Sequence, residues 1–283
     1  MIQLKRILKS ILKYKTSSGL TLLSLVISFT GIIILTLYVS FEKSFDRFHT
    51  NRDSIYRLEL RGEGSWLPAK MSTVIKNQIP EVGQITRLSS NNAFVTTPEL
   101  NETNTKFEAD CYWADSVFFN MFSFSLLLGD KTSVLNDPHS AVISESLSKK
   151  MFGGNNPVGQ TLLTDNISYH ITGVMKDFPK NSSLQADCIL PFSVYTAEKR
   201  YDYFDEWSEW SFNNLMMLKP GTDPDQVAAK IEKLAEIEVQ IKQEKAGYSG
   251  AGTFVYLRPL ADIHYINDGF FAGYTNPVVL NVF

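Results

Sequence analysis

One uncharged stretch, Gly19 to Phe41, constrains this chain more than any other feature. As an α-helix it would reach about 34 Å, which is enough to cross a hydrocarbon core about 30 Å thick. Only a helix or a closed barrel crosses lipid with every backbone hydrogen bond satisfied. A single stretch of this kind therefore predicts one transmembrane helix over residues 19–41.

Two other structures compete with a membrane span. A cleaved signal peptide has a shorter apolar region and then a small-residue cleavage site, and no Ala-x-Ala pattern follows this stretch. A buried core helix rarely runs this long without a charge. Both interpretations therefore rank below the span.

Small and hydroxyl-bearing residues interrupt the stretch at Ser24, Ser28, Thr30 and Gly31. Such residues let transmembrane helices approach one another closely. Ser and Thr hydroxyls also donate hydrogen bonds back to their own helix. The sequence leaves both interpretations open.

Charge is distributed unevenly about the stretch. Residues 1–41 hold five of the 27 lysines and arginines and no acid, while the remainder holds the other 22 and all 30 acidic residues. Positive charge marks the cytoplasmic flank of a span. We therefore expect a cytoplasmic N-terminus and an outer part of net charge −8. The outer part is long enough for one or two domains with real cores, and it has no basic cluster of the nucleic-acid-binding type.

The arm before the span, residues 1–18, shows helical periodicity. Its apolar and basic residues fall on opposite faces, with Leu4, Ile7, Leu8, Ile11 and Leu12 on one and Lys5, Arg6, Lys9 and Lys13 on the other. A basic amphipathic helix beside a span lies in the membrane interface and is attracted by anionic lipid. A mere topology signal would need charge but no periodicity, so we favour the interfacial helix.

The outer part alternates between strand and helix patterns. Phe41, Phe45 and Phe48 recur at helical spacing, which predicts that the span continues outward as a stalk over residues 42–53. Strands are expected over residues 54–61, 85–89, 93–97, 106–113, 140–143, 160–163, 167–176, 185–191, 212–218 and 253–257. Helices are expected over residues 66–79, from Asp115 or Ser116 to Phe122, over residues 144–152 between Ser144 and Gly153, and from Asp223 onward. Residues 199–211 and 246–252 are expected to be loops. The pattern predicts an α+β fold, a mixed α/β sheet with helices on it.

Two cysteines, Cys111 and Cys188, each lie in an expected strand. An oxidising compartment would permit a bridge, but a free Cys in a strand also packs as a small apolar residue. We favour unpaired, buried thiols. Their spacing supports neither redox catalysis nor a zinc site.

Catalytic and metal-binding patterns are poorly developed. S-x-x-K occurs at Ser146/Lys149 without the partner motifs of a β-lactam-type site. Asp262 and His264 could supply two metal ligands, whereas a site needs three or four. There is no P-loop, so this stretch of chain has no ATPase motif of its own. No catalytic residue, metal site or cofactor is therefore predicted.

Several longer blocks form an ordered series. They are SFDRFHTNRDSIYRL, ADSVFFNMFSFSLLLGD, SAVISESLSKKMFGGNNPVGQTL, ITGVMKDFPKNSSLQADCILPF, FNNLMMLKPGTD and LRPLADIHY. This series resembles the N-terminal half of MacB/FtsX-type ABC transporter permeases, in particular their MacB-like periplasmic core domain. The resemblance covers essentially the whole chain.

The resemblance implies a domain plan. Residues 54–105 and 211–268 would form a porter-like part, residues 106–210 an inserted β-rich part, and residues 269–283 the lead-in to a second transmembrane helix. The family has four spans per subunit, one before and three after the periplasmic domain. This sequence stops about where the second span should begin, so it is either part of a longer subunit or the product of a truncated gene. In both cases we expect no transport by this stretch alone.

The resemblance also implies partners and a location. Family members form permease dimers served by a cytoplasmic ABC ATPase, in the bacterial inner membrane, with the main domain in the periplasm. A periplasmic adaptor or other periplasmic protein is a further expected partner, beside the lipid bilayer. The expected function is non-catalytic coupling of ATP hydrolysis to movement of the periplasmic domain, for efflux, lipoprotein handling or control of periplasmic proteins.

Two alternatives rank below this function. A single-span extracytoplasmic sensor suits an outer α/β domain, but about 18 residues before the span are too few for an output domain. A signal-anchored periplasmic enzyme would need Ser146/Lys149 or Asp262/His264 to carry its chemistry.

Overall fold

The computed structural model describes residues 13–61, 64–198, 207, 210–234, 237, 254–266 and 270–271. The chain divides into two units, one that holds the N-terminal helix and one that spans Phe45–Asn276. The expected amphipathic helix lies almost wholly outside the described residues. So do the loop at 246–252, most of the loop at 199–211, and the lead-in at 269–283 apart from Phe270 and Phe271.

The first unit contains helix α2, Lys15–Glu42. Among the described residues it is the one helix long and apolar enough to cross a membrane, and its apolar side chains are exposed. The hydroxyls of Thr21, Ser24 and Ser28 donate to carbonyl oxygens of the preceding turn at 2.8–3.0 Å. These local bonds confirm one interpretation of the hydroxyl residues, while contact with other helices stays a prediction.

The predicted helical stalk is wrong. Helix α2 ends at Glu42, and residues 43–48 form turns. Asp46 has a φ of 55°, a left-handed conformation that an α-helix does not accommodate. Phe45 and Phe48 instead pack into the second unit, where Phe45 is buried and Phe48 lies against a hydrophobic cluster.

The second unit is built on a ten-stranded sheet. Its strands are β1 (Ile55–Leu60), β2 (Val82–Val95), β3 (Phe107–Ala114), β4 (Leu126–Leu128), β5 (Ser140–Ser144), β6 (Thr161–Thr164), β7 (Ile167–Met175), β8 (Cys188–Pro191), β9 (Asn213–Leu218) and β10 (Val255–Pro259). Their order is β10-β1-β9-β2-β3-β8-β5-β7-β4, with β6 paired to β7. The helices are η1 (Arg52–Ser54), α3 (Ala69–Gln78), α4 (Pro98–Glu102), α5 (Phe118–Met121), α6 (Glu145–Phe152), α7 (Val194–Ala197), α8 (Pro224–Glu232) and α10 (Leu260–Ile263). The predicted mixed α/β fold is confirmed. The sequence did not predict β4, α4, α7, α10 and η1.

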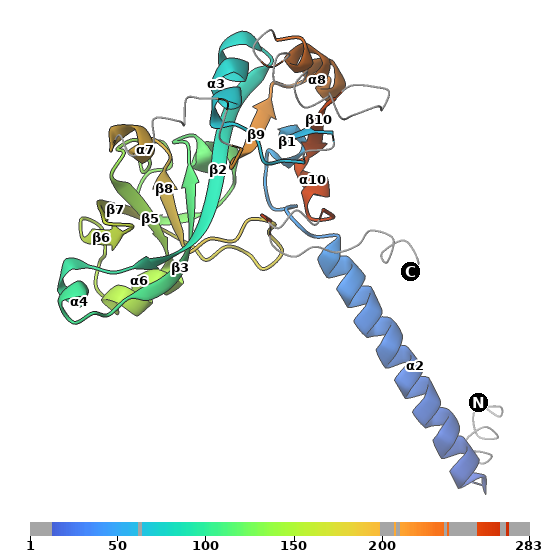
Figure 1. The fold of residues 1–283 in the computed structure, drawn as a ribbon. Coiled ribbons are helices and arrows are strands. Elements are labelled where there is room, and N and C mark those ends of the chain that lie inside the picture. Colours follow the sequence, from blue (N-terminus) through green and yellow to red (C-terminus); the bar gives the residue numbers. More distant parts are fainter. Residues whose placement is uncertain are drawn as a thin grey trace. The chain divides into compact units, whose positions relative to one another are not determined.

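Strand β2 is long and pairs with β9 along its first half and with β3 along its second half (Figure 1). Two separate strands were expected here, over residues 85–89 and 93–97, and this prediction is wrong. The polar run Ser90–Asn92 is exposed, yet it stays paired with residues 110–112 of β3, so it does not interrupt the strand. Residues 82–88 pair with β9, and residues 88–95 pair with β3.

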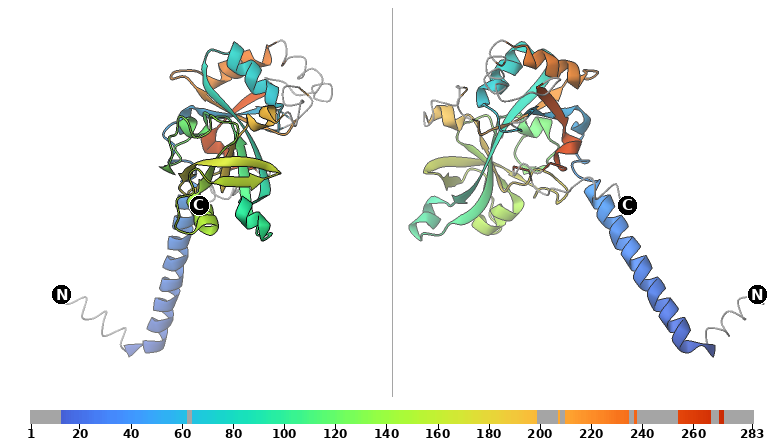
Figure 2. Two further views of the ribbon diagram at one scale, coloured as in Figure 1. Left: turned by 90° about the vertical axis from the view of Figure 1, so that its left-hand side faces the viewer. Right: turned by 45° about the vertical axis from the view of Figure 1, so that its right-hand side comes forward.

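This pairing divides the unit into two groups. The α3 group comprises β10, β1 and β9 with α3 and α8, and the α6 group comprises β3, β8, β5, β7, β4 and β6 with α6. Side chains of α3 and α8 share one buried cluster, and the two helices lie side by side in both views of Figure 2. The predicted domain boundaries at residues 105 and 210 stay a prediction.

Local sequence signals account for the helix ends. Ser144 Oγ accepts a hydrogen bond from Leu147 N at 3.1 Å, and Gly153 has a φ of 63° after the last turn of α6, as predicted. Asp223 caps α8 by accepting from Asp225 N at 2.9 Å. The cap of α5 differs, since Val117 holds that position instead of Asp115 or Ser116.

Strand β1 is buried on both faces although its sequence alternates. Arg57 and Glu59 are buried and paired, with Arg57 Nη2 2.6 Å from Glu59 Oε1. Arg258 on β10 makes a bidentate contact with the same carboxylate at 2.7 and 2.8 Å. The polar side of this strand is therefore a buried ion-pair network.

Candidate functional site: a buried junction of three segments

Three segments far apart in the sequence meet in the second unit. They are Phe45–His49, the loop 179–185 and the α10 turn that ends at His264. The amide of Asp46 donates to Asn181 O at 2.9 Å. In return, Asp46 Oδ1 accepts from Ser183 N at 3.0 Å and from Ser182 Oγ at 3.3 Å. We call Asp46, His49, Ser182, Ser183 and His264, with Phe45, the junction.

The left-handed backbone of Asp46 makes these contacts available. Asp is among the few non-glycine residues that adopt this conformation readily. Its side chain is only 1% exposed, so the carboxylate is held by protein donors instead of water. Burial raises the pKa of Asp46, while the hydrogen bonds from Ser183 and Ser182 and the charge of His264 oppose the rise.

His49 is the second buried polar group of the junction. Its Nδ1 accepts from Ser123 N at 3.0 Å, so the neutral ring carries its proton on Nε2. That nitrogen lies 3.8 Å from Asp46 Oδ1, which is too far for a hydrogen bond. Desolvation among the rings of Phe48, Phe122 and Phe124 lowers the pKa of His49 to about 4, so the ring is neutral at pH 7.

His264 fixes the third segment. Its ring stacks on Phe45 with centroids 3.4 Å apart and planes at 13°. His264 is 2% exposed and follows directly on α10. The stacked pair therefore ties the chain near residue 45 to the chain near residue 264.

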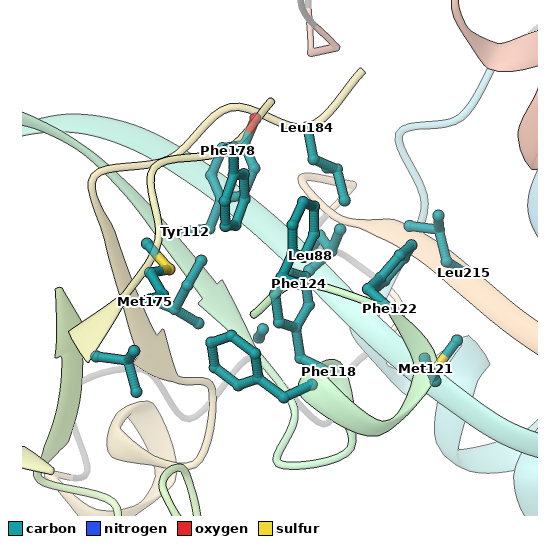
Figure 3. Packing of buried hydrophobic residues seen from close by; sticks show 14 of the residues in the cluster. Leu88, Tyr112, Phe118, Met121, Phe122, Phe124, Met175, Phe178, Leu184 and Leu215 are labelled. Carbon is teal, nitrogen blue, oxygen red and sulfur yellow. The ribbon is translucent and has the colours of Figure 1, made fainter. Parts of the chain in front are cut away.

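An aromatic cluster supports the junction (Figure 3). Phe124 and Phe178 stack with centroids 3.6 Å apart, and Phe118 packs on Phe124 at 5.8 Å. Phe178 lies just before the loop that Asp46 holds and Leu184 lies near its end, and both are buried in this cluster. The loop is thus fixed by apolar packing at its ends and by hydrogen bonds in its middle.

The residues of the pairs considered for catalysis have other partners in the structure. Ser146 Oγ donates to Asp177 Oδ2 at 2.6 Å, whereas Lys149 Nζ pairs with Glu145 at 2.5 Å. His264 serves the stacking described above, and Asp262 lies in α10. Within the described ranges, no group of three or more His, Cys, Asp or Glu residues could hold a metal ion.

The two cysteines face each other across β3 and β8. Cys111 is the register partner of Cys188, and both thiols are free and buried. The hydrogen bond with Cys111 and burial raise the pKa of the Cys188 thiol. The prediction of unpaired, buried cysteines is confirmed by the structure.

The junction itself was missed by residue-level reasoning. Asp46, Ser182 and His264 lie in three of the blocks that carried the family resemblance, and this was the available signal. Neither periodicity nor motif spacing connects residues 136 positions apart, as Asp46 and Ser182 are.

The sequence and the fold were compared with those of known proteins, and both point to one family. The sequence model described as the MacB-like periplasmic core domain matches residues 18–234. The chain belongs to this family. It is thus a MacB-like periplasmic domain of an ABC transporter permease, as the resemblance implied.

Curated relatives are distant and much longer. The macrolide export ATP-binding/permease protein MacB of Neisseria gonorrhoeae is 24% identical over 197 residues, which cover 66% of this chain and 30% of the relative. MacB of Neisseria meningitidis serogroup A is 23% identical over the same shares. The chain matches under a third of the length of these relatives.

Two solved structures share the fold. A domain of a Porphyromonas gingivalis protein described as a permease has a TM-score of 0.57 at 24% identity, covering 75% of this chain and 92% of that one. The periplasmic region of MacB from Actinobacillus actinomycetemcomitans has a TM-score of 0.51 at 14% identity, covering 75% and 91%. Both support the mixed α/β architecture of the second unit.

Proposed function

We propose that this chain is the N-terminal part of a MacB/FtsX-type permease subunit. In this proposal it couples ATP hydrolysis by a separate cytoplasmic ATPase to movement of the periplasmic domain. The subunit works as a dimer in the bacterial inner membrane and performs no catalysis itself. Efflux, lipoprotein handling and control of periplasmic proteins are the outputs that such movement serves.

The junction is the observation that carries this proposal. Phe45 and Asp46 follow the end of α2 by three and four residues, and both are buried in contacts with distant segments. A flexible linker at this place would absorb displacement of the chain. Hydrogen bonds to a buried carboxylate and a stacked ring pair resist it instead, because breaking them leaves polar groups unsatisfied.

The charge distribution supports the proposed orientation. Basic residues without acids precede the span, and the outer part carries the net negative charge. The positive-inside rule then puts the N-terminus in the cytoplasm and the second unit in the periplasm.

A purification and a distance measurement test the proposal. The gene product that contains this chain is isolated from its own membranes, and an ABC ATPase is expected to co-purify. A spin label at the exposed Asn77 of α3 then reports the distance between the two copies of the dimer. We expect ATP to change this distance in the parent protein. In Asp46→Gly the change is lost while ATP hydrolysis continues.

The control is Asp53→Asn, since the Asp53 side chain is 90% exposed and pairs only at the surface with Arg52. It should keep the ATP-dependent change. Absence of any co-purifying ATPase, or an unchanged response in Asp46→Gly, would contradict the proposed coupling.

A further inference from the structure

The two groups of strands in the second unit share a single residue of β2 that is paired on both sides. Leu88 is opposite Asn213 of β9 and also opposite Ala114 of β3. Of the described β2 residues, it alone has a register partner on both sides. Before Leu88 the strand pairs with β9, and after it the strand pairs with β3. A connection of one residue resists bending poorly, and a few such residues are enough to form a hinge between packed bodies.

At this point the two faces of β2 carry different side chains. Leu88 is buried in the aromatic cluster that supports the junction. Side chains alternate along a strand, so the adjacent Arg87 points to the opposite face. Apolar packing can restrain bending on the Leu88 side. On the other face, Ala69 and Phe212 share an apolar cluster with Phe192, and Arg87 adds polar contacts there.

Three hydrogen bonds join Arg87 to Asp115 across the connection, and a fourth joins Asp115 to Thr86. Asp115 Oδ2 accepts from Arg87 N at 2.7 Å and from Arg87 Nε at 3.0 Å, and Asp115 Oδ1 accepts from Arg87 Nη2 at 2.5 Å. Asp115 N donates to Thr86 Oγ1 at 3.2 Å. Asp115 follows β3, so these bonds join the β9-paired part of β2 to the end of a strand in the α6 group.

The guanidinium also reaches a third element. It lies 3.9 Å from the ring centre of Phe192, which follows β8. The edge of Phe192 meets Phe212, just before β9, at a centroid distance of 5.2 Å. The Arg87 side chain therefore contacts the α6 group at two places, while its backbone lies opposite Asn214 of β9 in the α3 group. Its planar, bidentate geometry cannot be reproduced by lysine.

We propose that Arg87 is a positioning residue that, with Asp115, clamps the α3 group and the α6 group into one rigid lever. The inference rests on the proposed function, because a lever transmits displacement only if it does not bend at Leu88. Exposed ion pairs contribute little to stability, but this pair is mostly buried, with side chains 22% and 24% exposed, and is reinforced through the backbone. Its effect is therefore expected on geometry more than on folding.

Spin labels on the two groups test the clamp in the purified full chain in detergent. The labels are attached to Asn77→Cys on α3 and Lys150→Cys on α6, because Asn77 and Lys150 are exposed. Cys111 and Cys188 are buried, and a sample without added cysteines checks that they stay unlabelled. We expect a single narrow distance distribution in the parent. In Arg87→Met the distribution should become about twofold broader, because the hinge at Leu88 is released.

Further variants separate the clamp from general destabilisation. Asp115→Asn should broaden the distribution similarly, and Arg87→Lys should fall between parent and Arg87→Met. The matched control is Arg52→Met, which removes the exposed Arg52–Asp53 pair and should leave the width unchanged. Circular dichroism should show native secondary structure in every variant.

Two results overturn the proposal. One is a parental width in folded Arg87→Met. The other is failure of both Arg87→Met and Arg87→Lys to fold, since a clamp is dispensable for forming the two groups. The measurement uses neither an ATPase nor ATP. Its outcome is therefore independent of whether the proposed coupling function holds.

Discussion

Asp46 holds the start of the second unit against the loop 179–185. Replacing it with Gly keeps the backbone at a φ of 55° but removes the acceptor of the Ser183 amide. We expect a loss of about 1–3 kcal/mol in the free energy of unfolding, because a buried amide loses its partner. Asp46→Asn retains both an acceptor and the left-handed conformation and should lose less.

Urea unfolding followed by tryptophan fluorescence measures these losses. Asp53→Asn serves as the matched surface control and should stay within about 0.5 kcal/mol of the parent. Equal stability of Asp46→Gly and the parent would show that the junction contributes nothing to the fold.

The lowered pKa of His49 predicts that the stability of the fold depends on pH. Its pKa is about 4 in the folded protein against an ordinary value of 6.5, so the unfolded chain binds the proton more readily. Stability should be full above pH 6.5 and fall as the pH drops toward 4, by about 3 kcal/mol in total. The raised pKa of Asp46, the charged group nearest to His49, acts in the opposite direction at the acid end.

Unfolding free energies at about pH 7.5 and about pH 5 measure this dependence. His49→Gln should flatten it, whereas His170→Gln, at an exposed position, should leave it intact. A parental pH dependence in His49→Gln would exclude His49 as its origin.

The burial of Cys111 and Cys188 predicts how their thiols react. Both thiols are buried, and the raised pKa of Cys188 keeps its thiol protonated. Native protein should therefore react with no alkylating reagent at either site. After unfolding without reductant, two thiols per chain should react, and none would react if the pair were a disulfide.

At the scale of elements, β4 and β7 meet at a glycine. A Cβ on Gly173 would lie 2.8 Å from Leu128 O and 3.2 Å from Val134 Cγ1. Gly173→Ala should therefore displace β4 and cost about 1–3 kcal/mol of stability. Gly154→Ala is the matched control, because nothing lies within 4 Å of its added Cβ. Thermal unfolding compares the two, and equal melting temperatures would contradict this packing.

Individual elements differ in how far the sequence predicted them. Helix α6 was predicted with both caps, because Ser144 and Gly153 act within a few residues of their own helix. Strand β2 was divided in two, because the pairing of its exposed polar run Ser90–Asn92 with β3 is not visible in the local pattern. The stalk failed for a related reason, since the Phe45 and Phe48 spacing serves packing against distant rings.

At the scale of the whole molecule, α2 should anchor the chain in a bilayer. Arginine in place of Ile33, near the middle of the apolar stretch, should oppose insertion by about 2.5–3.5 kcal/mol. Alkaline extraction of membranes should then release more of the Ile33→Arg protein than of the parent. Tyr14→Arg, before the helix begins, should remain in the membrane pellet. Equal retention of both variants would argue against α2 as a membrane span.

The sequence by itself determined the apolar helix, the alternation of strands and helices, the caps of α6 and α8, and the family. These follow from local periodicity, from side chains acting within a turn, and from ordered blocks. Only the tertiary structure decided the junction of Asp46 with Ser183 and the clamp between Arg87 and Asp115. Asp46 and Ser183 are 137 positions apart, so nothing short of the folded sheet brings that carboxylate to its donors.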